Sequence, residues 1–387
     1  MDERIKALRQ ERTQRIITTL KNEKADRIPS VAWRADYLVY YYGYTMSQID
    51  SHEKMLEIFK RADQDFDFTV CDPIEPIGLT YPVKESICAG SMYRLNDDGN
   101  AVQIDPSLIE IMKPDEYDAF NADTLHYLAD VCLPRRYGIL SPDMPKEEKF
   151  ARLKQLDEVA ARSGAFRRAV WDQTALVGSA HIFYGMPVDV IFDFLRNFTG
   201  IILDIRRQPQ KLIEACEILE GYTIKDIKSA PVIPGSSATC ALHLAPFLKA
   251  KDFEKVYWPS FRRIIEATHE CGHSSKLLFE KSWKHVFDFL DDLPVNSVCG
   301  YFEKEDGFEN VCKRLGDHMI IAGGIETELL ARGTVEENVN QIKRIIDECC
   351  QDGGVFLAPD LPMVYKVDGN PENYKAVMDT IRDYGTF

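Results

Sequence analysis

The chain alternates between short apolar runs and longer amphipathic segments, and this alternation occurs eight times along its 387 residues. The run Val355–Ala358 is too apolar to be one face of an exposed strand, which indicates a strand buried on both sides, as in parallel sheets. Because no block of consecutive strands interrupts the alternation, an α/β fold with a closed (β/α)8 TIM barrel fits better than an open, doubly wound sheet. The predicted strands are Arg27–Trp33, Phe66–Cys71, Ala175–Ala180, Val232–Gly235, Lys276–Phe279, Ser297–Cys299, Met319–Ala322 and Gly354–Ala358.

Helical segments follow most of these strands. After the last strand, Asn370 is suited to cap a helix N-terminus and Pro371 to occupy its first position. No glycine-rich phosphate-binding fingerprint follows any predicted strand, which argues against a nucleotide site of that type. The predicted helices include Ser51–Ala62, Val188–Ile205, Pro209–Ile227, Ala250–Glu270, Trp283–Leu290, Thr334–Cys350 and Pro371–Tyr384.

One stretch, Pro82–Arg168, breaks the alternation. Within it, Tyr93–Ile104 has two short β-like runs around an Asp-Asp-Gly-Asn turn, which predicts a hairpin. The remainder is charged and mostly helical in pattern. We therefore predict an insertion at about 82–168, after the second strand, that caps the mouth or builds a homodimer surface. No linker separates independent domains, so residues 1–387 are expected to form a single barrel domain.

The composition, with 45% hydrophobic and 28% charged residues, is that of a soluble globular protein. No apolar run reaches the ~18 residues that a membrane span needs, and the charged N-terminal segment lacks the apolar core of a secretory signal. The ten cysteines have no regular spacing, which predicts reduced thiols in a cytoplasmic protein. The net charge of −15 disfavours nucleic acid and anionic membranes as partners.

In a β/α barrel, the residues just past each strand meet at one mouth, where the chemistry is found. Several of these residues here are charged, and charges that end buried strands are costly to desolvate unless they pair or face a ligand cavity. The alternative for each is a salt bridge or a turn at the rim. The candidates are Trp33, Arg34, Asp72, His181, Ser236, Ser237, Glu280, Lys281, Tyr301, Gly323, Gly324 and Asp360.

The predicted strands place the histidines at different faces of the barrel. His181 follows the third predicted strand and is the histidine we expect at the mouth. His243 also follows a strand, and a core or capping role is expected for it. His269 and His273 have the spacing of a metal motif, but they precede the fifth strand and so fall on the opposite, stability face of the barrel.

Over Ile191–Gly385 the chain resembles the uroporphyrinogen decarboxylase superfamily, which also includes cobamide-dependent methyltransferases that exchange methyl groups with corrinoid proteins. The N-terminal half resembles it more loosely, through Ala25–Pro29. The segments that carry the stronger resemblance are Phe192–Phe198 with Leu203, Asp204 and Pro209; Leu244–Pro246 with Phe253 and Tyr257–Pro259; Ala322–Glu326 with Leu330–Glu337; and Asn370–Asn373 with Tyr384 and Gly385.

The resemblance implies a single β/α barrel and two sets of site residues, neither of which is complete. For the decarboxylases it implies that Arg34 binds a substrate carboxylate and Asp72 the pyrrole nitrogens, but their second arginine is missing and Tyr184 is out of register with their catalytic tyrosine. For the methyltransferases it implies a zinc site of one histidine and two cysteines after strands five and eight. Glu280 and Asp360 stand at those places instead.

These residues lead to one preferred hypothesis and two alternatives. We expect a corrinoid (cobalamin)-dependent methyltransferase that acts with a corrinoid protein, in which Glu280, Asp360 and His181 hold a zinc ion that polarises the methyl donor. In that hypothesis the catalytic residues are Asp72, His181, Glu280 and Asp360, and the substrate-binding residues are Trp33, Arg34, Ser236, Tyr301 and Gly323.

The first alternative is a cofactor-free decarboxylase of uroporphyrinogen or a related tetrapyrrole. The second is a barrel that binds a tetrapyrrole or corrinoid without chemistry. If no metal binds, Glu280 is expected to pair with Lys281 or Arg34.

Overall fold

The centre of the fold is a parallel six-stranded sheet in the order β10-β9-β8-β7-β6-β5. The computed structural model describes residues 2–73, 75–88, 93–103 and 110–387, with Cys88 described by its backbone alone. The strands of this sheet are β5 (Ala180–Phe183), β6 (Ser237–Leu242), β7 (Ser274–Phe279), β8 (Val298–Phe302), β9 (Ile320–Ile325) and β10 (Val355–Pro359).

Two further parallel strands, β1 (Val31–Ala32) and β2 (Val70–Cys71), pair with each other. This pair also lies against both edges of the six-stranded sheet. On one side the Leu357 amide of β10 donates to the Pro29 carbonyl at 2.9 Å. On the other side the Cys71 amide donates to the Val177 carbonyl at 3.0 Å, just before β5.

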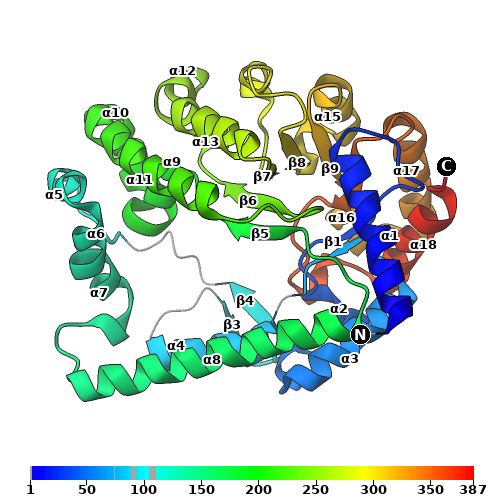
Figure 1. The fold of residues 1–387 in the computed structure, drawn as a ribbon, viewed down its shortest axis with the longest axis horizontal. Coiled ribbons are helices and arrows are strands. Elements are labelled where there is room, and N and C mark those ends of the chain that lie inside the picture. The colour runs from blue at the N-terminus through cyan, green and yellow to red at the C-terminus, as the bar shows by residue number, and fades with distance from the viewer. Residues whose placement is uncertain (1, 74, 89–92, 104–109) are drawn as a thin grey trace.

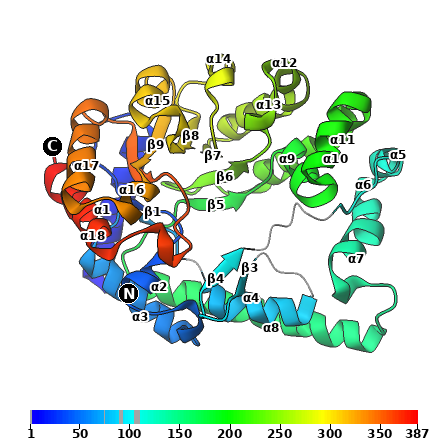
Figure 2. The ribbon, with the colours of Figure 1, turned by 180° about the vertical axis from the view of Figure 1, so that it is seen from behind.

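Helices cover the outer side of the six-stranded sheet. Figures 1 and 2 show α11, α13, α15 and α17 lying along it. The helices are α1 (Glu3–Leu20), α2 (Tyr37–Tyr41), α3 (His52–Asp65), α4 (Ile77–Cys88), α5 (Tyr117–Ala122), α6 (Thr124–Tyr127), α7 (Leu133–Arg136), α8 (Lys146–Gln173), α9 (Pro187–Ile191), α10 (Asn197–Arg207), α11 (Pro209–Ser229), α12 (Ala250–Asp252), α13 (Trp258–Glu270), α14 (Phe287–Leu290), α15 (Phe308–Leu315), α16 (Thr327–Arg332), α17 (Val335–Cys349) and α18 (Pro371–Tyr384).

Short 3₁₀ and π-helical turns lie between these elements. They are η1 (Met46–Gln48), η3 (Leu128–Cys132), η4 (Gly138–Leu140), η5 (Phe192–Arg196), η6 (Ala245–Phe247), η7 (Phe253–Tyr257), η8 (Lys284–Val286), η9 (Lys304–Asp306) and η10 (Lys366–Asp368). Among the residues described, no helix combines the length and apolar character required to cross a membrane.

The strands separate two apolar cores, because successive side chains of a strand point to opposite faces. The larger core lies between the strands and the helices and includes Leu242, Leu277 and Phe302. The smaller core gathers side chains from β1, β2, β8, β9 and β10 together with Ile16 of α1. It consists of Ile16, Val31, Val70, Val177, Cys299, Tyr301, Ile320, Ala322, Phe356 and Ala358.

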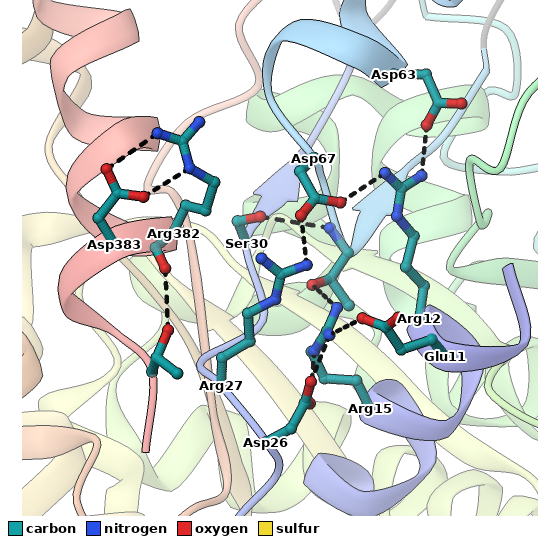
Figure 3. Close-up of polar contacts among 12 residues, drawn as sticks. Glu11, Arg12, Arg15, Asp26, Arg27, Ser30, Asp63, Asp67, Arg382 and Asp383 are labelled. Atoms are coloured by element: carbon teal, nitrogen blue, oxygen red, sulfur yellow. Dashed lines mark hydrogen bonds and ion pairs between the residues drawn. The ribbon is translucent and has the colours of Figure 1, made fainter. Parts of the chain in front are cut away.

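Helix α1 lies across the N-terminal ends of several strands. Its three buried arginines bond to residues just before or beside those strands, and Figure 3 shows two of them, Arg12 and Arg15, with their partners. Arg12 bonds to Asp63 and Asp67, and Arg15 bonds to Asp26 and to Thr69, which precedes β2. Arg9 donates to the Thr174 carbonyl ahead of β5. We call the arginines Arg9, Arg12 and Arg15 with these partners the basal network.

Between β2 and β5 the chain forms a run of helices and one hairpin, in the stretch where an insertion at about residues 82–168 was predicted. It contains α4, the antiparallel hairpin of β3 (Tyr93–Leu95) and β4 (Ala101–Gln103), helices α5 to α7, and the 28-residue helix α8. The predicted hairpin is confirmed for residues 93–103, and its last residue, Ile104, lies outside the described residues. In Figure 1, α8 runs beside α3 and α4, and α8 contacts both helices.

Two predicted strands were misplaced along the chain, which changes which residues reach the strand ends. Val232 and Ile233 are exposed and lie between two prolines, and the real strand is β6, whose small and polar residues hid it from an apolarity search. The third strand, predicted at Ala175–Ala180, is β5 at Ala180–Phe183. Ser236 therefore precedes a strand, and His181 lies inside one.

Candidate active site

His243 and Glu280 lie side by side where two neighbouring parallel strands end. Leu242 of β6 is paired with Phe279 of β7, so the next residue of each strand lies at the same height. His243 Nε2 is 3.3 Å from Glu280 Oε1, and His243 Nδ1 is 2.6 Å from Asp193 Oδ2. We call Asp193, His243 and Glu280 the His243 triad. Its side chains are 15%, 33% and 39% exposed, respectively, so the group is open to solvent on one side.

The carboxylate behind His243 comes from the segment after β5. Pro187 starts α9, which continues into the π-helical turn η5 and carries Asp189 and Asp193 on one face. Asp189 is buried, and it accepts hydrogen bonds from the Leu244 amide at 2.8 Å and the Tyr257 hydroxyl at 2.6 Å. Since Leu244 follows His243 directly, Asp189 fixes the backbone that carries the imidazole.

This arrangement shifts two proton affinities in the same direction. Burial opposes the charged imidazole, but hydrogen bonds to Asp193 and Glu280 outweigh it and raise the pKa of His243 to about 11. Burial raises the pKa of Asp189 to about 7, against the opposing effects of His243 and Tyr257. At neutral pH the triad therefore holds an imidazolium between two carboxylates.

His243 is the main residue of the site that sequence reasoning undervalued, since it was expected in a core or capping role. With β6 placed correctly, its position directly after a buried strand would have identified it. Glu280 pairs with His243, whereas Lys281 pairs with Glu303 and Glu305. The Lys281 backbone is left-handed, with φ 57°, and its amide donates to Glu303 Oε2 at 2.9 Å.

A second polar group lies deeper, between the strands. Asp72, just after β2, accepts hydrogen bonds from the Ser179 amide at 2.6 Å and the Ser179 hydroxyl at 2.7 Å. Lys276 of β7 places its ammonium 2.6 Å from Ser179 Oγ and 3.5 Å from Asp72 Oδ2. The same ammonium lies 4.7 Å from the centre of the Tyr301 ring, which makes an edge contact with Trp33.

We call these five residues, Trp33, Asp72, Ser179, Lys276 and Tyr301, the inner group. Three of them, Trp33, Asp72 and Tyr301, were predicted as site residues, and they do lie together. Lys276 and Ser179 were missed. A lysine at the start of the predicted strand Lys276–Phe279 was the available signal for Lys276, because a charge in a buried strand needs a partner.

Arg34 lies elsewhere at the strand ends, close to the hairpin. Its Nε donates to Asp36 Oδ2 at 2.9 Å, and its guanidinium lies 5.4 Å from the Tyr93 ring centre. The Asp36 side chain is 1% exposed, and burial raises its pKa against the opposing effect of Arg34. The positive charge of Arg34 is therefore matched by a buried carboxylate of the same loop.

Asp360 and Gly323 have local structural roles in this arrangement. Asp360 is buried, and its Oδ1 accepts from the Thr327 amide at 2.9 Å and hydroxyl at 2.6 Å, at the start of α16. Gly323 has φ 141°, and a Cβ atom there would lie 2.9 Å from the Phe302 carbonyl oxygen and 3.1 Å from Phe308. Close packing against a neighbouring strand and helix explains why this position is a glycine.

His181 and Ser236 lie together, but near the start of β6 rather than past its end. His181 Nδ1 is 3.0 Å from Ser236 Oγ, and the His181 ring lies 5.3 Å from that of His273, which precedes β7. Burial, followed by the neighbouring His273, lowers the pKa of His181. The expectation that His181 reaches the mouth is therefore wrong.

The predicted zinc ligands are not gathered in one place. Within the described part of the chain, no three histidine, cysteine, aspartate or glutamate side chains are grouped so that they could hold a metal ion. His181, Glu280 and Asp360 belong to three separate contacts, with Ser236, His243 and Thr327 respectively.

Comparisons with known proteins agree with this architecture. No curated protein matches the sequence. Among solved structures, a methyltransferase from Methanosarcina mazei superposes with a TM-score of 0.60 over 96% of this chain and 98% of its own, at 15% identity, and so shares the fold. The family model of uroporphyrinogen decarboxylase (URO-D) matches residues 139–384, which is more than half of the sequence. The chain therefore belongs to the uroporphyrinogen decarboxylase (URO-D) family.

Proposed function

We propose that this protein is a methyltransferase of the URO-D family that removes a methyl group from a small methoxylated or methylated-amine compound. The observation that carries the proposal is the His243 triad, an imidazole held between two carboxylates at the strand ends, where Glu280 replaces the zinc-binding histidine implied by the resemblance to methyltransferases. When bound, a corrinoid on a partner protein supplies the acceptor of the methyl group.

In the proposed reaction His243 acts as the acid. As the bond between the methyl carbon and its oxygen or nitrogen breaks, the leaving atom gains electron density and takes the proton from His243 Nε2. Asp193 holds the opposite nitrogen at 2.6 Å and keeps the ring in position. Glu280 favours the charged imidazole before the transfer, and water returns the proton afterwards.

A resident zinc ion has no part in these steps. The three expected ligands lie in separate contacts. His181 bonds to Ser236, and Asp360 bonds to Thr327 at the start of α16. No step is therefore assigned to a metal, and His243 takes the role of polarising the leaving group.

We further infer that the eight parallel strands form one closed barrel with its mouth at the His243 triad. The hydrogen bonds from Leu357 to Pro29 and from Cys71 to Val177 support this inference, because they link β1 and β2 to both edges of the six-stranded sheet. In such a barrel the inner group lies below the mouth, where Asp72 and the aromatic rings would line the floor of the substrate site.

Methyl transfer to free cobalamin, with 3-methoxybenzoate and trimethylamine as probe donors, tests the proposal. We expect transfer with at least one donor and a loss of about 10²- to 10⁴-fold in Glu280→Gln, since the imidazolium loses one of its two carboxylates. Glu305→Gln is the matched control, because Glu305 is an acid near the same rim that pairs with Lys281 instead. Equal activity in the two variants would contradict the assignment.

Decarboxylation of a tetrapyrrole is the second candidate, favoured by the position of Asp72. Two observations count against it. Arg34 is already matched by Asp36, and Asp72 already accepts two hydrogen bonds from Ser179. Formation of coproporphyrinogen from uroporphyrinogen by the purified protein would establish this function. Binding of a tetrapyrrole or corrinoid with no turnover of any compound would favour the non-catalytic alternative.

A further inference from the structure

The inner group already contains a positive charge that belongs to the chain itself, the ammonium of Lys276. This ammonium lies 4.7 Å from the centre of the Tyr301 ring and 3.5 Å from Asp72 Oδ2. Trp33 makes an edge contact with Tyr301, with the ring centroids 5.5 Å apart. Aromatic rings are the surroundings in which proteins recognise methylated ammonium groups, and a nearby carboxylate adds to the attraction. The inner group therefore has the composition of a cation site, and Lys276 occupies it.

Several contacts hold Lys276 in this place. Its side chain is 5% exposed, and its ammonium lies 2.6 Å from Ser179 Oγ as well as near Asp72. The Ser179 hydroxyl in turn donates to Asp72 Oδ2 at 2.7 Å. A ligand that pushed this ammonium aside would leave a buried charge without its partners, which is costly. Any ligand that reaches the inner group therefore meets Lys276 in place.

The inner group is open to a ligand in part. The Asp72 side chain is 24% exposed, and Trp33 and Leu278 are only partly buried. Successive side chains of a strand alternate between its two faces, so Lys276 and Leu278 lie on the same face of β7. The His243 triad lies past the end of that strand. A donor whose methyl group is at the triad can therefore extend its other end toward the inner group.

We propose that Lys276 determines which methyl donors the protein accepts, because it excludes methylated ammonium ions and leaves methyl ethers. A cationic donor would bring a second positive charge beside an ammonium that already uses Asp72 and the Tyr301 ring, and like charges repel strongly where water is excluded. A methoxylated compound brings no positive charge. The choice of a methyl ether rests on the proposed function, whereas the exclusion of cations does not.

Removal of this ammonium should convert the inner group into a binding site for methylated ammonium ions. Lys276→Met keeps an unbranched side chain and loses the charge. Asp72 then keeps both hydrogen bonds from Ser179, and its carboxylate and the two aromatic rings can attract an external cation. Lys281→Met is the matched control, because it removes the same charge from a lysine that is 55% exposed and pairs with Glu303.

Binding of tetramethylammonium, measured by isothermal titration calorimetry, tests the exclusion of cations. Circular dichroism first establishes that both variants are folded. We expect Lys276→Met to bind this ion at least about tenfold more tightly than the parent does, and Lys281→Met to bind it no more tightly than the parent. Equal affinity of the parent and Lys276→Met for tetramethylammonium would overturn the proposal.

The donor preference of the parent provides a second test that needs no variant. Methyl transfer to free cobalamin should have a kcat/KM at least about 100-fold higher with 3-methoxybenzoate than with trimethylamine, which is protonated at neutral pH. Equal transfer from the two donors would also overturn the proposal. Absence of transfer from both donors would contradict the proposed function alone, because the tetramethylammonium comparison still decides whether Lys276 excludes cations.

Discussion

The two ends of the parallel strands use charged side chains in opposite ways. At the N-terminal ends, Arg12 is completely buried and bonds to two carboxylates, and Arg15 is held in the same manner. At the other end, His243 and Glu280 are each about one-third exposed, and the His243 imidazolium loses its positive charge when it gives up a proton. Fixed guanidinium charges stabilise, whereas a titratable imidazole open to solvent is suited to chemistry.

Pairing of a cation with carboxylates therefore does not by itself identify a functional site. Both ends contain a cation between two carboxylates, yet only the His243 triad combines exposure, a strongly shifted pKa and a group able to give up its charge.

Removal of Arg12 should cause the largest loss of stability. Arg12→Ala leaves Asp63 and Asp67 facing each other without their shared cation, and breaking a buried pair in this way costs about 3–5 kcal/mol. Urea denaturation measures the change in the free energy of unfolding. Arg382→Ala, which removes an exposed pair with Asp383 (Figure 3), should cost less than about 1 kcal/mol. Similar losses in the two variants would remove the contrast between buried and exposed pairs.

The two ends should respond to pH with opposite signs. The pKa of Asp189 is raised to about 7 in the folded state, against its usual 3.8. Between these two pH values Asp189 is protonated in the folded state and ionised in the unfolded state. Stability should therefore fall as pH rises from about 4 to 7, on the order of 2–4 kcal/mol, and Asp189→Asn should abolish this dependence.

In the basal network burial acts against ionised Asp67, but the hydrogen bonds from Arg12 and Arg27 outweigh it and lower its pKa. That contribution is present above the usual aspartate pKa and is lost as pH falls through the lower folded value. Arg12→Ala should weaken the acid sensitivity, as followed by thermal melting between pH 2 and 5. A parent protein whose stability is flat between pH 4 and 7 would contradict the Asp189 assignment.

Loss of the Asp193 carboxylate should change the proton affinity of His243 with little change in stability. In Asp193→Asn the imidazolium keeps Glu280 alone, so the pKa of His243 should fall from about 11 toward its usual 6.5. Histidine NMR titration measures this shift, and the alkaline limit of methyl transfer should move with it. Asp306→Asn changes an acid in a nearby loop that bonds to Trp283 and Ser282, and it should leave the His243 titration unchanged.

Asp360 should show the smallest effect, although its sequence position suggested catalysis. Asp360→Ala removes the acceptor for the Thr327 amide at the start of α16, which should cost about 1 kcal/mol, as for other helix-capping residues. Methyl transfer by the folded variant should stay within about twofold of the parent. A 100-fold loss of methyl transfer with unchanged stability would instead indicate that Asp360 belongs to the active site.

Much of the fold could be predicted because it depends on local patterns. Buried runs such as Val355–Ala358 and capped helices such as Pro371–Tyr384 lie within one or two residues of their predicted bounds. The small polar strand β6 could not be recognised by apolarity, since its burial comes from its neighbours on both sides.

The site was harder to predict, because one misplaced strand reverses the end at which a residue lies. Ser236 and His181 were assigned to the mouth for this reason, and His243 was undervalued. Glu280 and Asp72 do lie at strand ends, because β7 and β2 end where predicted. Their partners, His243 for Glu280 and Lys276 for Asp72, are set by contacts between distant segments that no local pattern encodes.

The most direct test compares the two histidines in one assay. His243→Gln and His181→Gln are each measured for methyl transfer to cobalamin with the donor that the parent accepts, after circular dichroism has established that both are folded. The account predicts a loss of at least about 100-fold in His243→Gln and activity within about twofold of the parent in His181→Gln. A large loss in His181→Gln together with an active His243→Gln would contradict the placement of the active site.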